Sequence, residues 1–397
     1  MFLRRKKSPS TKKSWIIDLK IALLTYATKP RGSVVHTLEL AIALTRLNHQ
    51  VCIFALDKDE QGFEQKLPCA VGLIPADAAP REINQLIYQR IQEFVLFLSA
   101  QSLGFDIYHA QDCIGANALL ELRQQGKISH FVRTVHHIEN YPSPYLQQCQ
   151  DKSIRYPDLC LCVSDRWQQS LKNDYGIHAP RVFNGVNLER FSAQPCSGDA
   201  DLKGRYGLTG TPIFLTVGGI EPRKNSICLL KAFAQVRLQY PHAQLAIAGG
   251  ATLFDYQPYR DRFFEVAQAL DIRVGQSLVL PGIIPFADLP ALYRCADVFC
   301  FPSVKEGWGL VVLEAIASGL PIVLSKQPPF TEFLASDQAH WVNPERPDAI
   351  AQGMIQAVKA PLILDAAKRD SLLSTYSWQR SAQGHLERYR QLITAHQ

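Results

Sequence analysis

The sequence contains no Cys-x-x-Cys pair, and its apolar runs are all shorter than a membrane span. Most of its ten cysteines lie inside apolar runs, such as residues 159–163, where cysteine is typical of a small buried side chain. These absences argue against a disulfide framework, a zinc cluster and an integral membrane protein. We therefore expect a cytoplasmic protein that holds no metal and no cofactor.

The sequence also lacks a strong excess of either charge, because the formal net charge of its 397 residues is only +6. Part of it belongs to a basic stretch at residues 4–13, which precedes any apolar pattern. The rest of the chain is close to neutral, which argues against a nucleic-acid-binding enzyme. No apolar segment of signal-peptide length follows the basic stretch. We expect residues 1–19 to form a disordered tail; a weak peripheral contact with an anionic membrane is the alternative.

Short apolar runs alternate with amphipathic stretches along the chain, which is typical of βαβ units and a parallel sheet. The length exceeds one ordinary compact core, so we predict an α/β protein with two Rossmann-like domains. The predicted strands span residues 20–25, 50–55, 106–109, 131–135, 159–163 and 181–183, followed by 213–217, 244–248, 277–280, 297–301 and 321–324.

The alternating pattern lapses between residues 191 and 210, which is the expected connection between domains. We predict an amino-terminal domain over residues 20–188, a carboxyl-terminal domain over 189–375 and a final helix over 376–397. Parallel sheets bind ligands at the carboxyl ends of their strands. A cleft between the two domains is therefore the expected site.

The most informative stretch follows the strand predicted at 297–301. A glycine-rich turn leads into a helix that we expect to start near Gly309. The first N–H groups of this helix, from about Trp308 to Val311 and including Leu310, have no helical partner and suit a diphosphate. Gly307 and Gly309 let the backbone approach such a ligand closely.

Two glutamates flank this helix start. Glu306 lies in the preceding loop, and Glu314 lies one to two turns inside the helix. Carboxylates accept charge-assisted hydrogen bonds from vicinal hydroxyls, so we expect one to face a sugar and the other a ribose. The plainer interpretation, two solvated surface residues, fits either glutamate alone better than it fits the pair.

A second patch follows the first strand of the carboxyl-terminal domain and includes Gly218, Gly219, Arg223 and Lys224. A cation at this place can neutralise a leaving diphosphate, whose negative charge grows as the glycosidic bond breaks. We predict this role for Lys224. Arg223 either shares the role or points elsewhere.

Residues 280–332 resemble the glycosyl transferases group 1 family of retaining GT-B glycosyltransferases, which includes glycogen synthase-like and phosphatidylinositol mannosyltransferase-like enzymes. Glu306 and Glu314 match its Glu-x7-Glu motif, and residues 289–297 match the element before it. The Asn-Gly-Val-Asn block at 184–187 and the segment at 375–378 extend the resemblance more weakly to residues 20–395.

The resemblance implies a GT-B fold, with Glu306 on the transferred sugar and Glu314 on the ribose of the nucleotide. It also implies that His136 reaches the transferred sugar. Further donor contacts fall on glycines of the loops, namely Gly32, Gly218, Gly219 and Gly249. At Gly219 the chain departs from the family, which has an arginine there.

The expected reaction is a retaining, metal-independent transfer of a hexosyl group from a nucleotide diphosphate sugar to a hydroxyl acceptor. The resemblance implies that the leaving phosphate helps to deprotonate the acceptor on the same face. The sequence leaves the sugar, the acceptor and the oligomeric state open. We expect acceptor specificity in loops at residues 75–90 and 138–150.

Two other functions compete with this one. A nicotinamide-dependent oxidoreductase requires Gly-x-Gly-x-x-Gly after the first strand, where this chain has only Gly32. A catalytically silent member that binds a nucleotide sugar or serves as a partner subunit is favoured by Gly219 alone.

Overall fold

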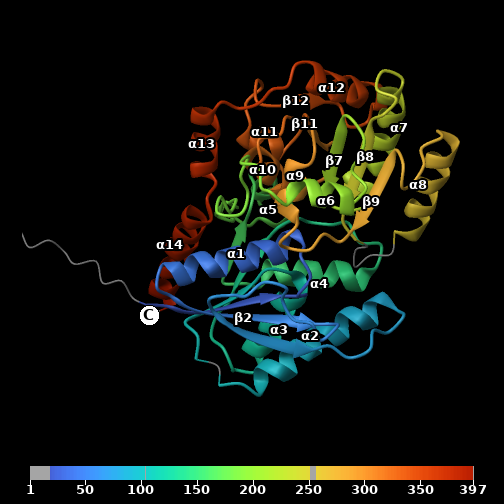
Figure 1. The fold of residues 1–397 in the computed structure, drawn as a ribbon. Coiled ribbons are helices and arrows are strands. Elements are labelled where there is room, and N and C mark those ends of the chain that lie inside the picture. Colours follow the sequence, from blue (N-terminus) through green and yellow to red (C-terminus); the bar gives the residue numbers. More distant parts are fainter. Residues whose placement is uncertain (1–17, 103, 251–255, 397) are drawn as a thin grey trace, which may run out of the picture.

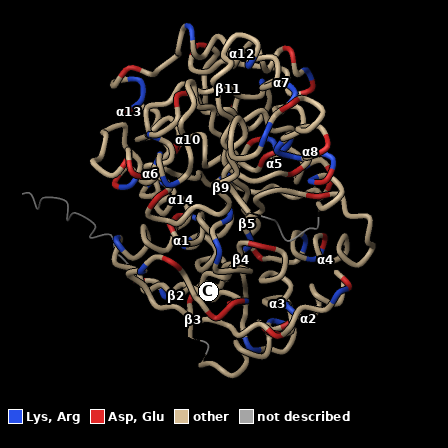
Figure 2. The backbone as a smooth tube through the Cα atoms, turned by 45° about the vertical axis from the view of Figure 1, so that its right-hand side comes forward, with Lys and Arg blue, Asp and Glu red and all other residues tan. Residues whose placement is uncertain are grey.

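A computed structural model describes residues 18–102, 104–250 and 256–396, which form two α/β domains stacked one above the other (Figure 1). Most of the tail predicted over residues 1–19 lies outside the described residues. Basic and acidic positions are spread over both domains, and neither domain carries one sign of charge alone (Figure 2).

The amino-terminal domain contains β1 (Lys20–Thr25), α1 (Gly32–Arg46), β2 (Gln50–Asp57), β3 (Ala70–Pro75), α2 (Ile83–Ser99), β4 (Ile107–Ala110), α3 (Cys113–Gln124), β5 (Val132–Val135), α4 (Pro144–Arg155), β6 (Leu159–Cys162) and α5 (Asp165–Tyr175).

The carboxyl-terminal domain contains α6 (Asp199–Arg205), β7 (Ile213–Val217), the 3-10 helix η1 (Pro222–Lys224), α7 (Ser226–Arg237), β8 (Gln244–Ala248), α8 (Gln257–Ala269), β9 (Leu278–Gly282), α9 (Leu289–Arg294), β10 (Val298–Phe301), α10 (Leu310–Ala317), β11 (Ile322–Ser325), α11 (Phe330–Phe333), β12 (His340–Val342), α12 (Pro347–Lys359) and α13 (Ala366–Thr375), and α14 (Trp378–His396) follows.

Each domain is built on a six-stranded parallel sheet, with the orders β3-β2-β1-β4-β5-β6 and β12-β11-β10-β7-β8-β9. The strand order therefore reverses between β1 and β4 in one sheet and between β7 and β10 in the other. In open parallel sheets, ligands bind beyond the carboxyl ends of the strands at this reversal. A ligand site is thus expected at the loops that follow these four strands.

Both faces of the amino-terminal sheet are buried, which explains why its strands are continuous apolar runs. Alternate residues of β1 enter opposite cores: Ala22 and Leu24 pack with α2, α3 and α4, while Ile21 and Leu23 pack with α1 and α14. Helix α14 follows the carboxyl-terminal domain in sequence but lies along α1 (Figure 1). Its buried side chains therefore complete the core of the amino-terminal domain.

The strand predictions were correct for most of both sheets but failed at the edges. The edge strand β3 was not predicted, because it contains Gly72 and Pro75 and is largely exposed. The other edge strand, β12, has only three residues. The strand predicted at 181–183 was wrong, since only Arg181 pairs there, in a single bridge to Cys162. The predicted loops at 75–90 and 138–150 also contain the first turns of α2 and α4.

Candidate active site

The loops after β7 and β8 pack backbone against backbone. Gly218 and Gly249 both have φ of +140°, and a Cβ on Gly249 would lie 2.5 Å from the nitrogen of Gly219. The N–H of Gly218 donates to the carbonyl of Ala248 at 2.7 Å. Only glycine leaves room for this close approach. The contact fixes the loop after β7, which carries Arg223 and Lys224.

Lys224 lies directly over Gly218. A Cβ on Gly218 would be 2.7 Å from Cε of Lys224, so the glycine makes space for the lysine chain. Lys224 ends η1, whose first residue Pro222 presets the turn. Its ammonium group is almost fully buried and lies 4.4 Å from the centre of the Phe301 ring.

Glu306 forms ion pairs with both Lys224 and Arg223, the two cations that the sequence places in this region. Lys224 donates to its Oε1 at 2.7 Å, and the guanidinium of Arg223 lies 3.3 Å from its Oε2. Burial alone would raise the pKa of Glu306, but the charges of Lys224 and Arg223 together hold it below the usual value. Burial lowers the pKa of Lys224 even though Glu306 acts in the opposite direction. Glu306 is thus ionised, and Arg223 points to the same place as Lys224.

Gly219 does not have space for the arginine of the family pattern. Its φ is +78°, and a Cβ would lie 2.8 Å from the carbonyl oxygen of Gly250. Arg223, four residues later, brings a guanidinium to Glu306 and also contacts Glu221 at 2.9 Å. The positive charge missing at position 219 is therefore present beside Lys224, but it comes from another point of the chain.

Helix α10 begins at Leu310, four residues after Glu306. Gly309 precedes the helix with φ of +99°, and no side chain caps it. The N–H groups of Leu310 and Val311 lie in this first turn, where the helix offers them no acceptor. The side chain of Trp308 is buried against Phe333, with ring centres 4.8 Å apart, so only its backbone could meet a ligand.

Glu314 lies one turn inside α10 and is held by α9. The hydroxyl of Tyr293 donates to its Oε2 at 2.7 Å. Burial raises the pKa of Glu314 to about 7, although Tyr293 and the charge of Arg190 act against it. The two glutamates of the motif therefore differ: Glu306 is ionised by its cations, and Glu314 titrates near neutral pH.

His136 comes from the opposite domain and meets Gly307. It follows β5, and a Cβ on Gly307 would lie only 2.3 Å from its carbonyl oxygen. Its Nε2 donates to the side-chain oxygen of Gln111 at 3.0 Å. Burial, followed by the charges around it, lowers the pKa of His136 well below the usual value. The predicted histidine is a neutral group at the point where the two domains touch.

Gly32 begins α1 at the carboxyl end of β1. A Cβ there would meet no atom, and Arg31 precedes the helix without a side-chain cap, whereas α2 to α5 all have one. The first turn of α1 is thus open, although the structure does not bring Gly32 into contact with the residues around Glu306. His36, which the sequence left undecided, is fully buried and donates to Asn184 at 2.6 Å.

Two contacts around Glu306 could not be predicted from the sequence. Trp167 donates through Nε1 to the carbonyl of Glu306 at 3.2 Å, and Lys305 forms an ion pair with Glu139 at 2.7 Å. These partners lie far apart in the chain, and no local pattern marks them. Tyr293, the partner of Glu314, stands instead within residues 289–297, a segment that matches the family pattern.

Two general findings bear on the environment of the protein. Within the described ranges, no helix is long and apolar enough to cross a membrane. Over the same residues, histidine, cysteine and acidic side chains do not gather in any group of three that could hold a metal ion.

Comparisons with known proteins match both halves of the chain to glycosyltransferases. The family model for glycosyl transferases group 1 matches residues 201–371, and that for glycosyltransferase family 4 matches residues 30–190. An uncharacterised glycosyltransferase of Methanocaldococcus jannaschii is 24% identical over 94% of this chain and 98% of its own. A GDP-mannose-dependent α-(1-6)-phosphatidylinositol monomannoside mannosyltransferase of Mycolicibacterium smegmatis is 34% identical over 36% of this chain and 37% of its own.

The fold has close relatives among solved structures. Sucrose-phosphate synthase from Thermosynechococcus elongatus superposes with a TM-score of 0.76, at 22% identity, over 95% of this chain and 100% of the other. Fold, charge cluster and family matches together define a glycosyltransferase with two Rossmann-like domains and a nucleotide-sugar donor. The chain thus has a GT-B fold whose carboxyl-terminal half matches the family model for glycosyl transferases group 1 and whose amino-terminal half matches that for glycosyltransferase family 4. The nicotinamide-dependent alternative was therefore wrong.

Proposed function

We propose that the enzyme transfers a hexosyl group from a nucleotide diphosphate sugar to a hydroxyl acceptor, with retention of configuration and without a metal ion. The observation that carries the proposal is the convergence of Lys224 and Arg223 on Glu306 beside the open first turn of α10. Two cations and free N–H groups stabilise the charge that develops on a leaving diphosphate.

The same arrangement supports retention without a protein nucleophile. A retaining glycosidase needs two carboxyl groups that flank the bond, one of them as nucleophile. Here Glu306 is held by two cations and Glu314 is held by Tyr293. We infer that the bond from the anomeric carbon to phosphate breaks as the bond to the acceptor oxygen forms on the same face. The acceptor proton then passes to the leaving phosphate oxygen.

The donor would lie between the two domains. The diphosphate would contact Lys224, Arg223 and the backbone at Gly309 and Leu310, and Glu306 would accept from hydroxyls of the transferred sugar. His136, at the touching point of the domains, would hydrogen bond to the same sugar as a neutral group. Gly32 at the open start of α1 would complete the phosphate contacts.

The test is nucleotide release from UDP-, GDP-, ADP- and dTDP-sugars by the purified protein, with and without EDTA. We expect slow hydrolysis of one donor, unaffected by EDTA. Loss of Lys224 should remove transition-state stabilisation worth a factor of roughly 100 or more. Lys224→Ala and Glu306→Ala should therefore nearly abolish release, while the exposed control Lys231→Ala should not.

Two results would contradict the proposal. Release that requires a divalent ion would remove metal independence. Tight donor binding without turnover, even with acceptors from a cell extract, would show that the charge of Arg223 does not replace the arginine absent at Gly219. A catalytically silent role would then follow. Retention itself is read from the anomeric configuration of the product by NMR.

A further inference from the structure

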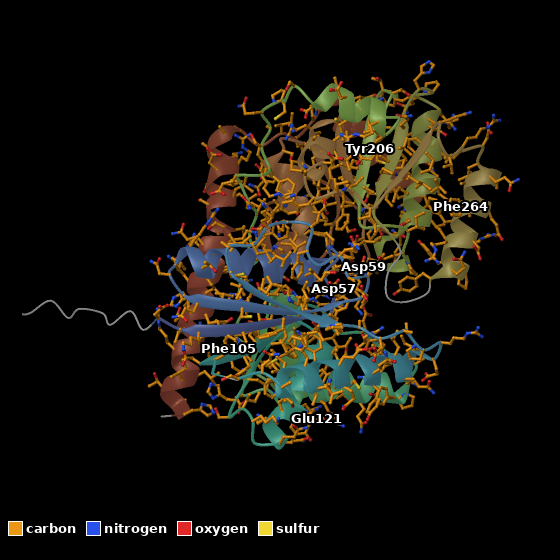
Figure 3. All side chains as sticks on the ribbon, turned by 60° about the horizontal axis from the view of Figure 1, so that its bottom comes forward. Asp57, Asp59, Phe105, Glu121, Tyr206 and Phe264 are labelled. Carbon is orange, nitrogen blue, oxygen red and sulfur yellow. The ribbon has the colours of Figure 1, made fainter. Side chains whose placement is uncertain are left out.

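Gln111 is a buried polar residue that the proposed donor contacts do not include. Strand β2 ends at the edge of the amino-terminal domain that faces the other domain, where Asp57 and Asp59 are seen (Figure 3). The strands of this sheet are parallel, so β4 and β5 end at the same edge. Gln111 directly follows β4, and His136 directly follows β5. Their side chains meet there, with Oε1 of Gln111 3.0 Å from Nε2 of His136.

The amide group of Gln111 rests on the ring of His109. The side chain is 1% exposed, and the backbone N–H of Gln111 donates to the carbonyl of Leu24 on β1 at 3.0 Å. Its Nε2 lies 3.3 Å from both ring nitrogens of His109. An atom in the ring plane at equal distance from the two nitrogens would overlap the ring carbons. The amide nitrogen therefore lies over the face of the ring.

This position decides which way the amide points. An N–H group over the face of an aromatic ring is favourable, whereas a carbonyl oxygen would meet the negative face of the ring. The nitrogen therefore belongs on His109 and the oxygen on His136. The ring of His109 is itself fixed by two hydroxyl groups, that of Tyr389 on α14 at 2.6 Å and that of Thr134 at 2.8 Å.

The oxygen of Gln111 in turn decides which nitrogen of His136 carries the proton. An amide oxygen can only accept, so Nε2 must be the donor. Burial lowers the pKa of His136 well below the usual value, and a neutral imidazole has a single N–H. Nδ1 is therefore an acceptor. Within the described residues it has no hydrogen-bond partner.

The ring of His136 is also held from its other sides. The ring of His36 crosses it nearly at right angles, with the ring centres 4.8 Å apart, and His36 is anchored by Asn184 at 2.6 Å. The carbonyl oxygen of His136 lies against Gly307 of the other domain. His136 thus cannot turn its Nε2 towards a ligand without losing its contact with Gln111.

We propose that Gln111 is a positioning residue of the donor site, which holds His136 as the Nε2–H tautomer so that Nδ1 accepts a hydrogen bond from one hydroxyl of the transferred sugar. This inference rests on the proposed glycosyl transfer and adds how the site recognises the sugar. Because Nδ1 can only accept, a sugar that lacks this hydroxyl leaves a desolvated nitrogen without a partner. The contact therefore contributes to sugar specificity.

Two substitutions separate the volume of the side chain from its acceptor oxygen. Gln111→Met keeps the length of the side chain but has no acceptor oxygen, whereas Gln111→Glu keeps an oxygen that accepts from Nε2. Assays at pH 8, above the usual histidine pKa, keep His136 neutral in Gln111→Glu. Gln124→Met is the matched control, because Gln124 is exposed at the end of α3.

Monodeoxy forms of the donor that the nucleotide panel identifies locate the hydroxyl. In the wild type, we expect one deoxy position to lower kcat/KM about tenfold, the effect of one hydrogen bond. Gln111→Met should lower kcat/KM for the intact donor by a similar factor. It should no longer discriminate against that deoxy donor, because the same contact is already lost. Gln111→Glu should recover most of the activity and the discrimination.

The tautomer is read without turnover by ¹⁵N NMR of the full chain with labelled histidine. The signals of His136 are identified by their loss in His136→Asn. We expect the Nε2–H pattern in the wild type and in Gln111→Glu, and a mixture with the Nδ1–H form in Gln111→Met. The same spectra show whether each variant is folded.

An Nδ1–H or doubly protonated His136 in the wild type would overturn the inference. So would equal losses of kcat/KM in Gln111→Met and Gln124→Met, or full discrimination against every deoxy donor in a folded Gln111→Met, while the proposed transfer stands. A wild type that releases nucleotide from no donor would instead reject the proposed function. The sugar contact would fall with it, whereas the spectrum of His136 would still decide whether Gln111 sets the tautomer.

Discussion

Arg223 brings a guanidinium to Glu306 in a chain that has glycine at position 219, where the family pattern has an arginine. Gly219 lies in a turn with positive φ that packs on the backbone of Gly250, so a side chain there would be strained. Arg223 lies in η1 and turns back onto Glu306. Comparison of aligned positions alone therefore finds a missing arginine, whereas the structure shows a guanidinium beside Lys224 that comes from a residue four places on.

Glu314 should make donor binding depend on pH. Its pKa of about 7 means that half of the carboxyl groups are protonated at neutral pH. If the carboxylate accepts from the ribose, the ionised form binds, so affinity rises with pH. We expect the nucleotide sugar to bind about tenfold more weakly at pH 6 than at pH 8. Calorimetry at both values measures this ratio.

Glu314→Gln is the control, because glutamine has the same shape and does not titrate. Its affinity for the nucleotide sugar should change little between the two pH values. An equal pH dependence in the wild type and in Glu314→Gln would show that Glu314 is not the titrating group.

At the scale of elements, α14 joins the amino-terminal domain through buried histidines. The ring of His385 lies 5.5 Å from that of His36 and 5.8 Å from that of His109, and the hydroxyl of Tyr389 bonds to His109 at 2.6 Å. Nε2 of His36 and of His385 is buried without a hydrogen bond. Burial lowers the pKa of His36 to about 3 and that of His385 to about 4.

Acid should therefore weaken the attachment of α14. The unfolded chain takes up protons on these histidines below about pH 6.5, while the folded chain does so only near pH 3 to 4. The contribution of these buried histidines to the free energy of unfolding is fully present above about pH 6.5 and falls as the pH drops. The loss is about 1.4 kcal/mol per histidine at pH 5.5. Urea unfolding at pH 7.5 and 5.5 measures it.

His385→Phe keeps the ring volume and removes one titrating group, so its loss of stability between these two pH values should be smaller by about one histidine. The exposed His242→Phe should behave as the wild type. Glu314 titrates in the opposite direction, because its folded pKa is raised, but it is common to all three proteins and cancels in the comparison. Identical pH dependence in His385→Phe and wild type would contradict the assignment.

At the scale of the whole molecule, the two domains touch through the residues of the site itself. Trp167 and Glu139 of the amino-terminal domain hold the backbone of Glu306 and the side chain of Lys305. Glu332 accepts from the N–H groups of Asp165 at 2.7 Å and Arg166 at 3.0 Å, at the start of α5. Closing the domains and assembling the site are thus one event, which favours exclusion of water from the donor.

Gly307→Ala should separate the two halves of the site without unfolding either. The backbone of Gly307 is not in the positive-φ region, but the added methyl would meet the carbonyl of His136 at 2.3 Å. A displacement of about 1 Å in an active site can cost roughly 100-fold in rate. We expect such a loss in donor turnover, with the thermal midpoint nearly unchanged. Turnover assays and thermal melts check both.

Gly204→Ala is the matched substitution, since a Cβ at Gly204 in α6 meets no atom. It should retain full activity. If Gly307→Ala also retains it, the contact between Gly307 and His136 does not belong to the active form.

The sequence alone determined most of the strands and the two-domain α/β fold, because buried parallel strands are continuous apolar runs. It placed β7 and β8 with their observed bounds. It missed β3 and β12, since short edge strands lack a continuous buried pattern.

Only the tertiary structure decided which side chains meet. Three contacts of the site illustrate this: Arg223 with Glu306, Tyr293 with Glu314, and His136 with Gly307. The partners are up to 171 positions apart in the chain, and no local pattern encodes their contact.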